Sequence, residues 1–258
     1  MLITGIIGYP METTLSPAMH NAAFKELQMD AVYVRLPVRE ERLKEAIMGL
    51  KVLGFRGVNV TIPYKEKVIE YLDDIVNGAK KIGAVNTIVI EGDKLLGHNT
   101  DIYGFKESLR EYKINVTDNN LLLIGAGGAA RACAYVIDSM KPKRFVITDM
   151  IFEKAKVLSQ TYDAEVIESD KIRNIIPEMD IVINATPEDL QAAVLSVMRQ
   201  GVVYYDMNYK FKVLRKGGVK VINGLLMLVL QGARAFYLWT GRREPIEIMK
   251  KAAGVKDD

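Results

Sequence analysis

Lys65 and Asp101 are residues of the types that carry out acid–base chemistry, and each follows an apolar, strand-like run. The run at 57–61 is rich in β-forming residues and ends before Pro63, so Lys65 should lie where a strand opens into a loop or a helix start. Open α/β sheets hold their ligands at such strand ends. A lysine can donate a proton to a carbonyl oxygen, and an aspartate can keep it protonated and oriented. We therefore predict a buried lysine–aspartate pair beside a substrate.

Each of these residues also has a plainer explanation. A single lysine among charged neighbours, as Lys65 is, is most often a solvated surface residue. Asp101 is a good N-cap for a helix over 102–112, and Asn86 fits a turn. Only the combination of polar residues at several strand ends favours a functional site.

The whole sequence has the composition of an ordinary globular enzyme and is long enough for two domains. Its 258 residues include 35 basic and 32 acidic ones, so the net charge is +3 and no basic stripe predicts a nucleic-acid partner. The most apolar stretch, 225–230, is too short to span a bilayer. The single cysteine, Cys133, cannot form an internal disulfide and fits a reducing cytoplasm. We predict a cytoplasmic monomer or homodimer that acts on a small molecule, with no metal ligands assigned.

The first hundred residues alternate β and α patterns and predict a compact mixed sheet. Ser16 followed by Pro17 is a strong helix start with Ser16 as N-cap. The hydroxyls of the loop before it, beside a helix N-terminus, favour a bound carboxylate. Strands are expected at 2–9, 31–36 and 57–61, a hairpin at 85–90 and 94–96, and helices at 18–27, 41–53, 65–72, 74–82 and 101–112.

A second α/β region begins with a fully apolar strand at 121–124 that runs straight into a glycine turn. Gly125 and Gly127 would let the backbone approach a pyrophosphate, and the N-terminus of a helix over 128–140 would point at it. A turn used only for packing, or another kind of phosphate site, are the alternatives. Further strands at 144–148, 164–167, 181–184 and 202–205, with helices between them, predict a doubly wound sheet.

Two polar residues in this half of the chain are candidates for contact with a ligand. Asp149 follows the strand at 144–148, where a carboxylate would accept hydrogen bonds from the adenine ribose and repel a 2′-phosphate. It could equally cap a helix over 152–160. Gln231 lies in a long apolar helix expected over 225–240 and needs a polar partner, for which a substrate is one candidate.

Five motifs, in order over almost the whole chain, resemble those of the shikimate dehydrogenase family. They are Gly8-Tyr9-Pro10 with Ser16-Pro17-Ala18-Met19-His20-Asn21, then Asn59-Val60-Thr61-Ile62-Pro63-Tyr64-Lys65, Ala84-Val85-Asn86-Thr87, Asn99-Thr100-Asp101, and Gly224-Leu225-Leu226-Met227-Leu228 with Gln231. The resemblance implies reversible, NAD(P)H-dependent reduction of 3-dehydroshikimate to shikimate, a step of chorismate and aromatic amino-acid biosynthesis. It also implies a two-domain α/β fold. Residues 1–101 and 225–258 would form a mixed-sheet catalytic domain that binds the substrate, and residues 102–224 a Rossmann-like doubly wound domain that binds NAD(P).

The resemblance assigns roles to individual residues. Lys65 and Asp101 would be the catalytic pair, with Lys65 donating the proton to the carbonyl oxygen. The substrate carboxylate would be bound by Thr14, Ser16 and Tyr209, and its hydroxyls or ring by Asn59, Thr61, Asn86, Asp101 and Gln231. The dinucleotide would be bound by Gly125, Ala126, Gly127, Gly128, Ala129 and Asp149, with its nicotinamide between the domains near Thr186, Met207, Gly224 and Met227.

The sequence departs from the family where a 2′-phosphate would bind. The family's Asn-Arg-Thr motif aligns with Asp149-Met150-Ile151, so the arginine that grips NADP is absent and a carboxylate stands nearby. Lys154 or Arg131 could substitute for it. The residues therefore favour NAD, whereas family habit favours NADP.

Two other functions remain open. Asp149 lends weight to an NAD-dependent quinate/shikimate dehydrogenase that acts oxidatively. A non-catalytic cofactor-sensing or scaffold protein would keep the same fold, but the intact Lys65, Asp101 and Asn86 argue against it.

Overall fold

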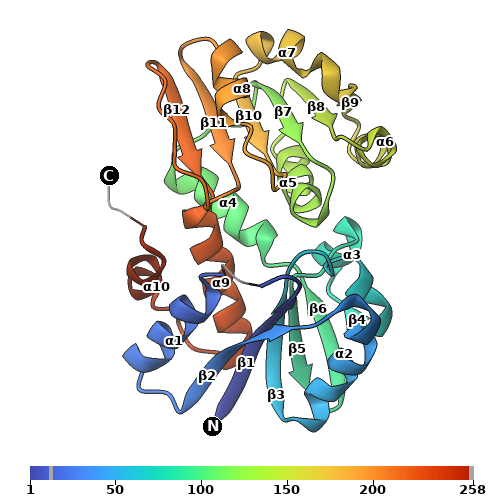
Figure 1. The fold of residues 1–258 in the computed structure, drawn as a ribbon, viewed down its shortest axis with the longest axis vertical. Coiled ribbons are helices and arrows are strands. Elements are labelled where there is room, and N and C mark those ends of the chain that lie inside the picture. The colour runs from blue at the N-terminus through green and yellow to red at the C-terminus, as the bar shows by residue number, and fades with distance from the viewer. Residues whose placement is uncertain (12–13, 256–258) are drawn as a thin grey trace. The chain divides into compact units, whose positions relative to one another are not determined.

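The computed structural model describes residues 1–11 and 14–255 and divides into two compact units. The first unit comprises Met1–Gly104 and Leu228–Asp258, and the second comprises Phe105–Met227. Each unit is built on its own six-stranded sheet (Figure 1). No helix in the described ranges has both the length and the apolar character of a membrane span.

The sheet of the first unit is mixed, as the sequence predicts. Its strand order is β2-β1-β3-β5-β6-β4, with β5 antiparallel to both β3 and β6 and the other pairs parallel. The predicted hairpin is confirmed, because Ile90 pairs with Leu95 across a short turn. The strands are β1 (Leu2–Gly8), β2 (Ala31–Pro37), β3 (Phe55–Val60), β4 (Asp74–Ile75), β5 (Thr87–Glu91) and β6 (Lys94–His98).

Helices cover both faces of this sheet, and successive strand residues serve opposite faces. Ile6 packs in a cluster with α1, α9 and α10, whereas its neighbour Ile7 packs in another with α2 and the 3₁₀ helix η2. Trp239 of α9 lies directly on the sheet, where its indole N–H donates to the Ile88 carbonyl at 3.0 Å. A side chain at Gly57 would overlap that indole, so this strand position requires glycine. The helical segments of this unit are α1 (Ser16–Glu26), η1 (Glu40–Arg42), α2 (Leu43–Val52), η2 (Lys67–Tyr71), α3 (Asn77–Ile82), α9 (Leu225–Thr240) and α10 (Ile246–Ala253), and α4 (Asp101–Glu111) begins in it and continues into the second unit.

Two predictions for the segment after β3 were partly wrong. The segment expected as a helix over 65–72 is the 3₁₀ helix η2, and the helix expected over 74–82 begins only at Asn77, as α3, because the strand β4 occupies Asp74–Ile75. The strand forms because Asp73 fastens the chain to the sheet edge: its carboxylate accepts the Leu95 N–H at 2.7 Å and pairs with Lys51 at 3.1 Å. Tertiary pairing has overridden local helix preference here.

The second unit has the predicted doubly wound, Rossmann-like sheet. All its strands are parallel, in the order β12-β11-β10-β7-β8-β9. The chain starts at the centre with β7, winds outwards to β9, and then returns to build β10, β11 and β12 on the other side. The strands are β7 (Asn120–Ile124), β8 (Arg144–Thr148), β9 (Glu165–Val166), β10 (Ile181–Asn184), β11 (Val202–Asp206) and β12 (Val219–Asn223).

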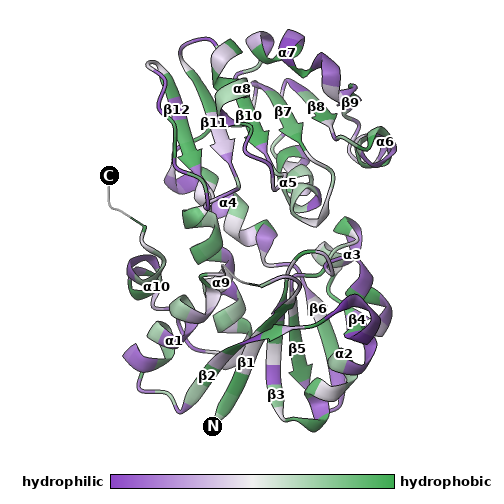
Figure 2. Cartoon of the chain, in the orientation of Figure 1, coloured by the Kyte–Doolittle hydropathy of each residue, from purple (hydrophilic) through white to green (hydrophobic). Residues whose placement is uncertain are grey.

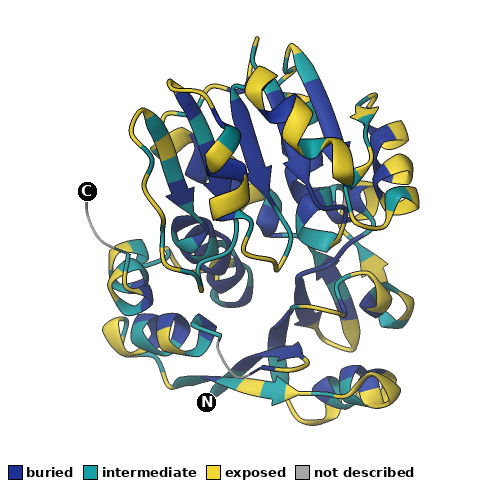
Figure 3. Cartoon of the chain, turned by 45° about the horizontal axis from the view of Figure 1, so that its top comes forward, coloured by how far each residue is buried: buried dark blue, intermediate teal, exposed yellow. Residues whose placement is uncertain are grey.

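The central strands of this sheet are apolar and buried on both faces, as expected for a parallel sheet (Figures 2 and 3). Leu122 and Val182 pack towards α7 and α8. Tyr205 lies with Phe105 of α4, and its hydroxyl meets the Ser108 hydroxyl at 2.9 Å. The helical segments are α5 (Gly128–Ser139), α6 (Phe152–Thr161), η3 (Ser169–Lys171), α7 (Ile172–Ile175), η4 (Ile176–Glu178) and α8 (Gln191–Val197).

The sixth strand, β12, was not predicted. It carries the exposed Lys220 and follows a Gly-Gly pair, so its sequence lacks the continuous apolar run of its neighbours. The crossover that leads to it, 207–218, contains no helix and is held along α8 by hydrogen bonds. Gln191 accepts the Leu214 N–H at 2.9 Å, and the Lys216 ammonium donates to the Leu195 and Met198 carbonyls, each at 2.6 Å.

Candidate active site

Lys65 and Asp101 lie together at one end of the first sheet. The Lys65 Nζ is 2.6 Å from the Asp101 Oδ2, and their side chains are 15% and 8% exposed. The strand order explains the meeting. Asn59 near the end of β3 pairs with Thr87 at the start of β5, and Thr87 pairs with His98 at the end of β6. The loops that carry the lysine and the aspartate therefore leave the sheet side by side.

The backbone around the pair is held by hydrogen bonds. The Val85 N–H donates to the Lys65 carbonyl at 2.7 Å, and Asn99 bridges the Ala84 carbonyl and the Asp101 N–H at 2.9 and 3.1 Å. Asp101 is the first residue of α4 rather than its predicted N-cap, and its carboxylate is turned to the lysine. The ammonium and carboxylate are therefore positioned by the fold before any ligand arrives.

Asn86 lies at the centre of a buried network beside the pair. Its Oδ1 accepts the Thr100 N–H at 2.7 Å and the Thr87 hydroxyl at 3.0 Å. Its amide nitrogen donates to the Gln231 Oε1 at 3.4 Å, and Gln231 in turn donates to the Leu228 carbonyl at 2.8 Å. Within residues 1–11 and 14–255, Gln231 thus donates one amide hydrogen to the protein and keeps the other for a ligand.

Thr87 and Thr100 belong to this network, although sequence reasoning did not select them. Both are buried, and their hydroxyl oxygens are 3.2 Å apart. Each directly follows an asparagine of a recognised motif, Asn86 or Asn99, and this position could have identified both threonines from the sequence.

Asn59 is bonded to the protein on three sides. The Tyr33 hydroxyl donates to its Oδ1 at 2.7 Å, and its amide donates to the Asn86 carbonyl at 3.2 Å and the Thr87 hydroxyl at 3.0 Å. Both amide hydrogens are therefore used internally. These bonds favour a role in positioning Asn86, and the predicted contact of Asn59 with substrate stays a prediction.

The hydroxyl residues predicted to bind a carboxylate are only partly grouped. The Thr14 hydroxyl donates to the Ser16 Oγ at 3.2 Å, so these two lie together at the start of α1. Ser16 is not an N-cap: it is the first helical residue, and Leu15 precedes it without a side-chain cap. Thr61, predicted to bind the substrate hydroxyls or ring, follows β3 and lies so close to Gly8 that a side chain at Gly8 would overlap it. Tyr209 belongs to the second unit, and its grouping with the others stays a prediction.

His20, from the first recognised motif, is fully buried in the first unit. Its ring stacks on Tyr33 with centroids 4.3 Å apart, and Trp239 and Phe236 lie around it. Neither ring nitrogen has a hydrogen-bond partner within the part of the chain that the structure describes. Burial lowers the pKa of His20 from 6.5 to about 3, so the ring is neutral at physiological pH.

The glycine turn of the second unit has the geometry that a dinucleotide requires. Gly125 has a φ of +117°, and a side chain there would lie 3.1 Å from the Ala185 backbone. A Cβ at Gly127 would meet no atom within 4 Å, so the backbone is open to a ligand at the point where α5 begins. An anion at this helix start would be stabilised by free N–H groups and the helix dipole. Ala126, Gly128 and Ala129 complete the turn and the first residues of α5.

Asp149 joins this turn to the start of α6. Its carboxylate accepts the Ala126 N–H at 2.7 Å and the Ile151 N–H at 2.8 Å. It is not the predicted N-cap of α6, because Ile151 occupies that position without a side-chain cap. Met150, where the family has its arginine, is 84% exposed and uncharged.

The residues predicted near the nicotinamide follow strands of the same sheet. Thr186 follows β10, Met207 follows β11, and Gly224 follows β12. A side chain at Gly224 would overlap the Met207 backbone, so these two loops touch. Met227 is buried in the first turn of α9. The second unit thus presents the glycine turn and three further loops along one edge of its sheet.

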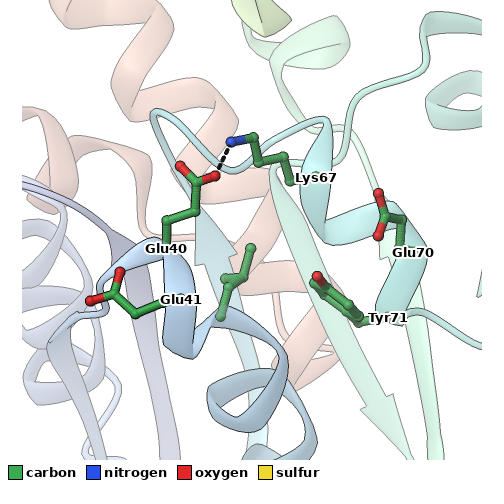
Figure 4. Close-up of a pocket in the computed structure, with 6 residues that line it drawn as sticks. Glu40, Glu41, Lys67, Glu70 and Tyr71 are labelled. Carbon is green, nitrogen blue, oxygen red and sulfur yellow. Dashed lines mark hydrogen bonds and ion pairs between the residues drawn. The ribbon is translucent and has the colours of Figure 1, made fainter.

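A hollow of about 560 Å³ lies elsewhere, over α2 and η2 (Figure 4). Glu40 and Glu41 of η1 line one side of it and Lys67, Glu70 and Tyr71 of η2 line the other, and Lys67 and Glu40 form an ion pair across it. None of its lining residues is among those predicted to bind substrate or cofactor.

Three family models match the chain. They are the shikimate dehydrogenase substrate binding domain at residues 6–88, shikimate / quinate 5-dehydrogenase at 107–200, and the shikimate 5′-dehydrogenase C-terminal domain at 224–253. A relative from Carboxydothermus hydrogenoformans named shikimate dehydrogenase (NADP(+)) is 43% identical over 98% of this chain and 96% of its own length.

Solved structures give the same result. A shikimate dehydrogenase in complex with NADP⁺ superposes with a TM-score of 0.89, at 38% identity over 99% of this chain and 96% of its own. The Thermus thermophilus enzyme in complex with NADP(H) and shikimate has a TM-score of 0.88, at 31% identity over 98% of this chain and 99% of its own. A quinate dehydrogenase from Corynebacterium glutamicum in complex with NAD also has a TM-score of 0.88, at 28% identity over 97% of this chain and 98% of its own.

Proposed function

The chain belongs to the shikimate dehydrogenase family, and on this premise we propose that it catalyses the reversible reduction of 3-dehydroshikimate to shikimate with NADPH. It is therefore an oxidoreductase of the route to chorismate and the aromatic amino acids. The observation that carries the reaction is the pair of Lys65 and Asp101, 2.6 Å apart and nearly buried. A cytoplasmic location and a monomeric or homodimeric state remain predictions.

The nicotinamide ring, when bound, supplies the hydride that reduces the C3 carbonyl. Lys65 has three ammonium hydrogens, and its contact with Asp101 uses only one of them. We assign to it the donation of a proton to the carbonyl oxygen as negative charge develops there. Asp101 holds the ammonium in place, and in the oxidative direction the amine takes the proton back.

Substrate recognition is assigned to the polar residues around this pair. The spare amide hydrogen of Gln231 and the side chains of Asn86 and Thr61 are directed to the ring hydroxyls, and Thr14 with Ser16 to the carboxylate. Asn86 is kept rigid by Thr87 and Thr100, so its ordering costs little when substrate binds. This arrangement favours a polyhydroxylated acid over an apolar ketone, because an apolar ligand would leave buried donors unpaired.

NADP is the cofactor named for the Carboxydothermus relative and bound in the two shikimate dehydrogenase structures, which supports NADP and not the preference for NAD that the sequence suggests. We propose that NADP serves here but that discrimination against NAD is weak. The reason lies at the β8–α6 turn, where the exposed Met150 offers no charge to a 2′-phosphate and Asp149 adds a negative one. Lys154, exposed in the first turn of α6, is the cation we assign to the 2′-phosphate.

Initial rates of shikimate oxidation with NADP and with NAD, measured in parallel, test both parts of the proposal. We expect turnover with either cofactor. Met150→Arg should raise the NADP-to-NAD ratio of kcat/KM by about tenfold or more, since a charge-assisted bond to phosphate is worth about 1.5–3 kcal/mol. Lys154→Ala should lower the ratio, whereas the matched Lys156→Ala, in the same helix, should leave it unchanged.

Each result bears on a separate claim. Turnover with neither cofactor would contradict the assigned reaction. An unchanged ratio in Met150→Arg would show that the 2′-phosphate binds elsewhere. Rates on quinate, measured beside those on shikimate, test the quinate/shikimate alternative, which a higher kcat/KM for quinate with NAD would favour.

A further inference from the structure

Asp206, the last residue of β11, is a buried carboxylate to which the reaction above gives no task. Asp206 is 3% exposed. The Asn184 amide donates to its Oδ1 at 3.2 Å and the Asn208 N–H at 2.9 Å, and the Tyr204 hydroxyl lies 3.3 Å from its Oδ2. These donors are all uncharged, so the carboxylate is held by hydrogen bonds from neutral groups. Such a costly arrangement calls for an explanation.

The residues that contact Asp206 also organise the loops after β10 and β11. The Asn184 Oδ1 accepts the N–H and the hydroxyl of Thr186 at 3.0 and 2.8 Å, and its amide also donates to the Glu188 carbonyl at 2.9 Å. The Asn208 amide donates to the Pro187 carbonyl at 2.9 Å. Asp206 therefore lies where the loops after β10 and β11 meet, and hydrogen bonds from Asn184 to Asp206 and from Asn208 to Pro187 join these loops.

These loops lie at the point where the strand order reverses. β10 and β7 are neighbours in the sheet, but the strands that follow β7 are added on one side of it and the strands that follow β10 on the other. Ligands of doubly wound sheets bind in the crevice at such a point. The loop after β10 touches the glycine turn after β7, because a side chain at Gly125 would lie 3.1 Å from Ala185. A dinucleotide with its pyrophosphate at the glycine turn would therefore extend over the Thr186 and Met207 loops.

We propose that Asp206 is the positioning residue for the nicotinamide half of the cofactor site. Its carboxylate draws Asn184 and Asn208 together and so sets the positions of Thr186 and Met207. The proposal rests on the nicotinamide-dependent function assigned above, and it adds a role for a residue that does not itself touch the reacting atoms.

The protonation state of this carboxylate should change near pH 6. Burial, with a smaller contribution from the negative charge of Asp189, raises the pKa of Asp206 to about 6, against the opposing effect of the hydrogen bonds from Asn208, Tyr204 and Asn184. The titratable groups that act on it are Tyr204, whose own pKa burial raises strongly, and Asp189. Protonation would replace an acceptor by a donor and loosen the loops, so the KM for the cofactor should rise as the pH falls through about 6.

The test compares Asp206→Asn with Asp206→Ala. Asparagine keeps an oxygen for Asn184 and Asn208, and its amide can donate to the Tyr204 oxygen, whereas alanine leaves three donors without an acceptor. We expect the KM for NADP to rise about tenfold or more in Asp206→Ala. In Asp206→Asn the KM should stay near that of the unaltered protein at about pH 8, and its rise towards about pH 5.5 should disappear.

Direct titration with NADPH, followed by nicotinamide fluorescence, separates this proposal from the assigned reaction. If NADPH binds but shikimate is not oxidised, the function fails while the role of Asp206 is still measured by the affinity. Asn208→Ala, which removes the bond to Pro187 without changing the buried carboxylate, should weaken NADPH binding about threefold to tenfold and covers the case in which Asp206→Ala does not fold. Unchanged NADPH affinity in Asn208→Ala, or a pH dependence that persists in Asp206→Asn, would overturn the proposal.

Discussion

Replacing Lys65 with methionine separates its catalytic role from its structural one. Methionine keeps the length of the side chain but has no proton to donate, and general acid catalysis is typically worth about 10²–10⁴ in rate. The same change leaves Asp101, whose side chain is 8% exposed, without the cation that stood 2.6 Å away. Breaking a buried ion pair costs about 3–5 kcal/mol. Because the lysine is itself 15% exposed, water can reach the carboxylate, and we expect the lower end of that range.

The double variant Lys65→Met with Asp101→Asn isolates the two effects. The neutral amide removes the unpaired charge, so most of the lost stability should return, measured as the free energy of unfolding in urea. The kcat for shikimate oxidation at saturating NADP should stay as low as in the single variant. A single variant with kcat within about threefold of the unaltered protein would refute Lys65 as the proton donor. Recovery of activity in the double variant would show that the single variant had failed by misfolding.

Two further predictions concern the glycine turn and the buried histidine. Gly125→Ala, at a φ of +117° and against Ala185, should cost about 1–3 kcal/mol in stability and weaken NADPH binding, whereas Gly127→Ala should weaken binding alone; equal melting temperatures for the two would contradict this. The pKa of His20 falls from 6.5 to about 3 on folding. Below about pH 6.5 the unfolded chain therefore binds a proton at His20 that the folded chain does not, and the free energy of unfolding should fall as the pH drops towards 3. His20→Phe, which keeps the aromatic packing, should lose about 2–3 kcal/mol of the difference in unfolding free energy between about pH 7.5 and 4.5, and an unchanged difference would show that other groups cause it.

Most of the secondary structure could be predicted from local patterns. The apolar run at β7, the glycine turn after it and the alternation of β and α segments each depend on neighbouring residues only. The sequence therefore predicted one mixed and one doubly wound sheet. The exceptions are β4 and β12. β4 is held by contacts of the preceding Asp73 with Leu95 and Lys51, which are distant in the chain. β12 is a strand because it pairs with β11, and not because of its own residue pattern.

The candidate site divides in the same way. The residue types at the strand ends identified the polar groups, and the fold does bring Lys65 to Asp101 across 36 positions of sequence. The chain could not reveal which polar groups are already bonded to one another. Asn59 has both amide hydrogens engaged, Asp149 accepts the Ala126 and Ile151 N–H groups, and Gln231 bonds to Asn86 from 145 positions away. Residue type sets what a side chain can donate or accept, but only tertiary contacts decide how much of that capacity remains for a ligand.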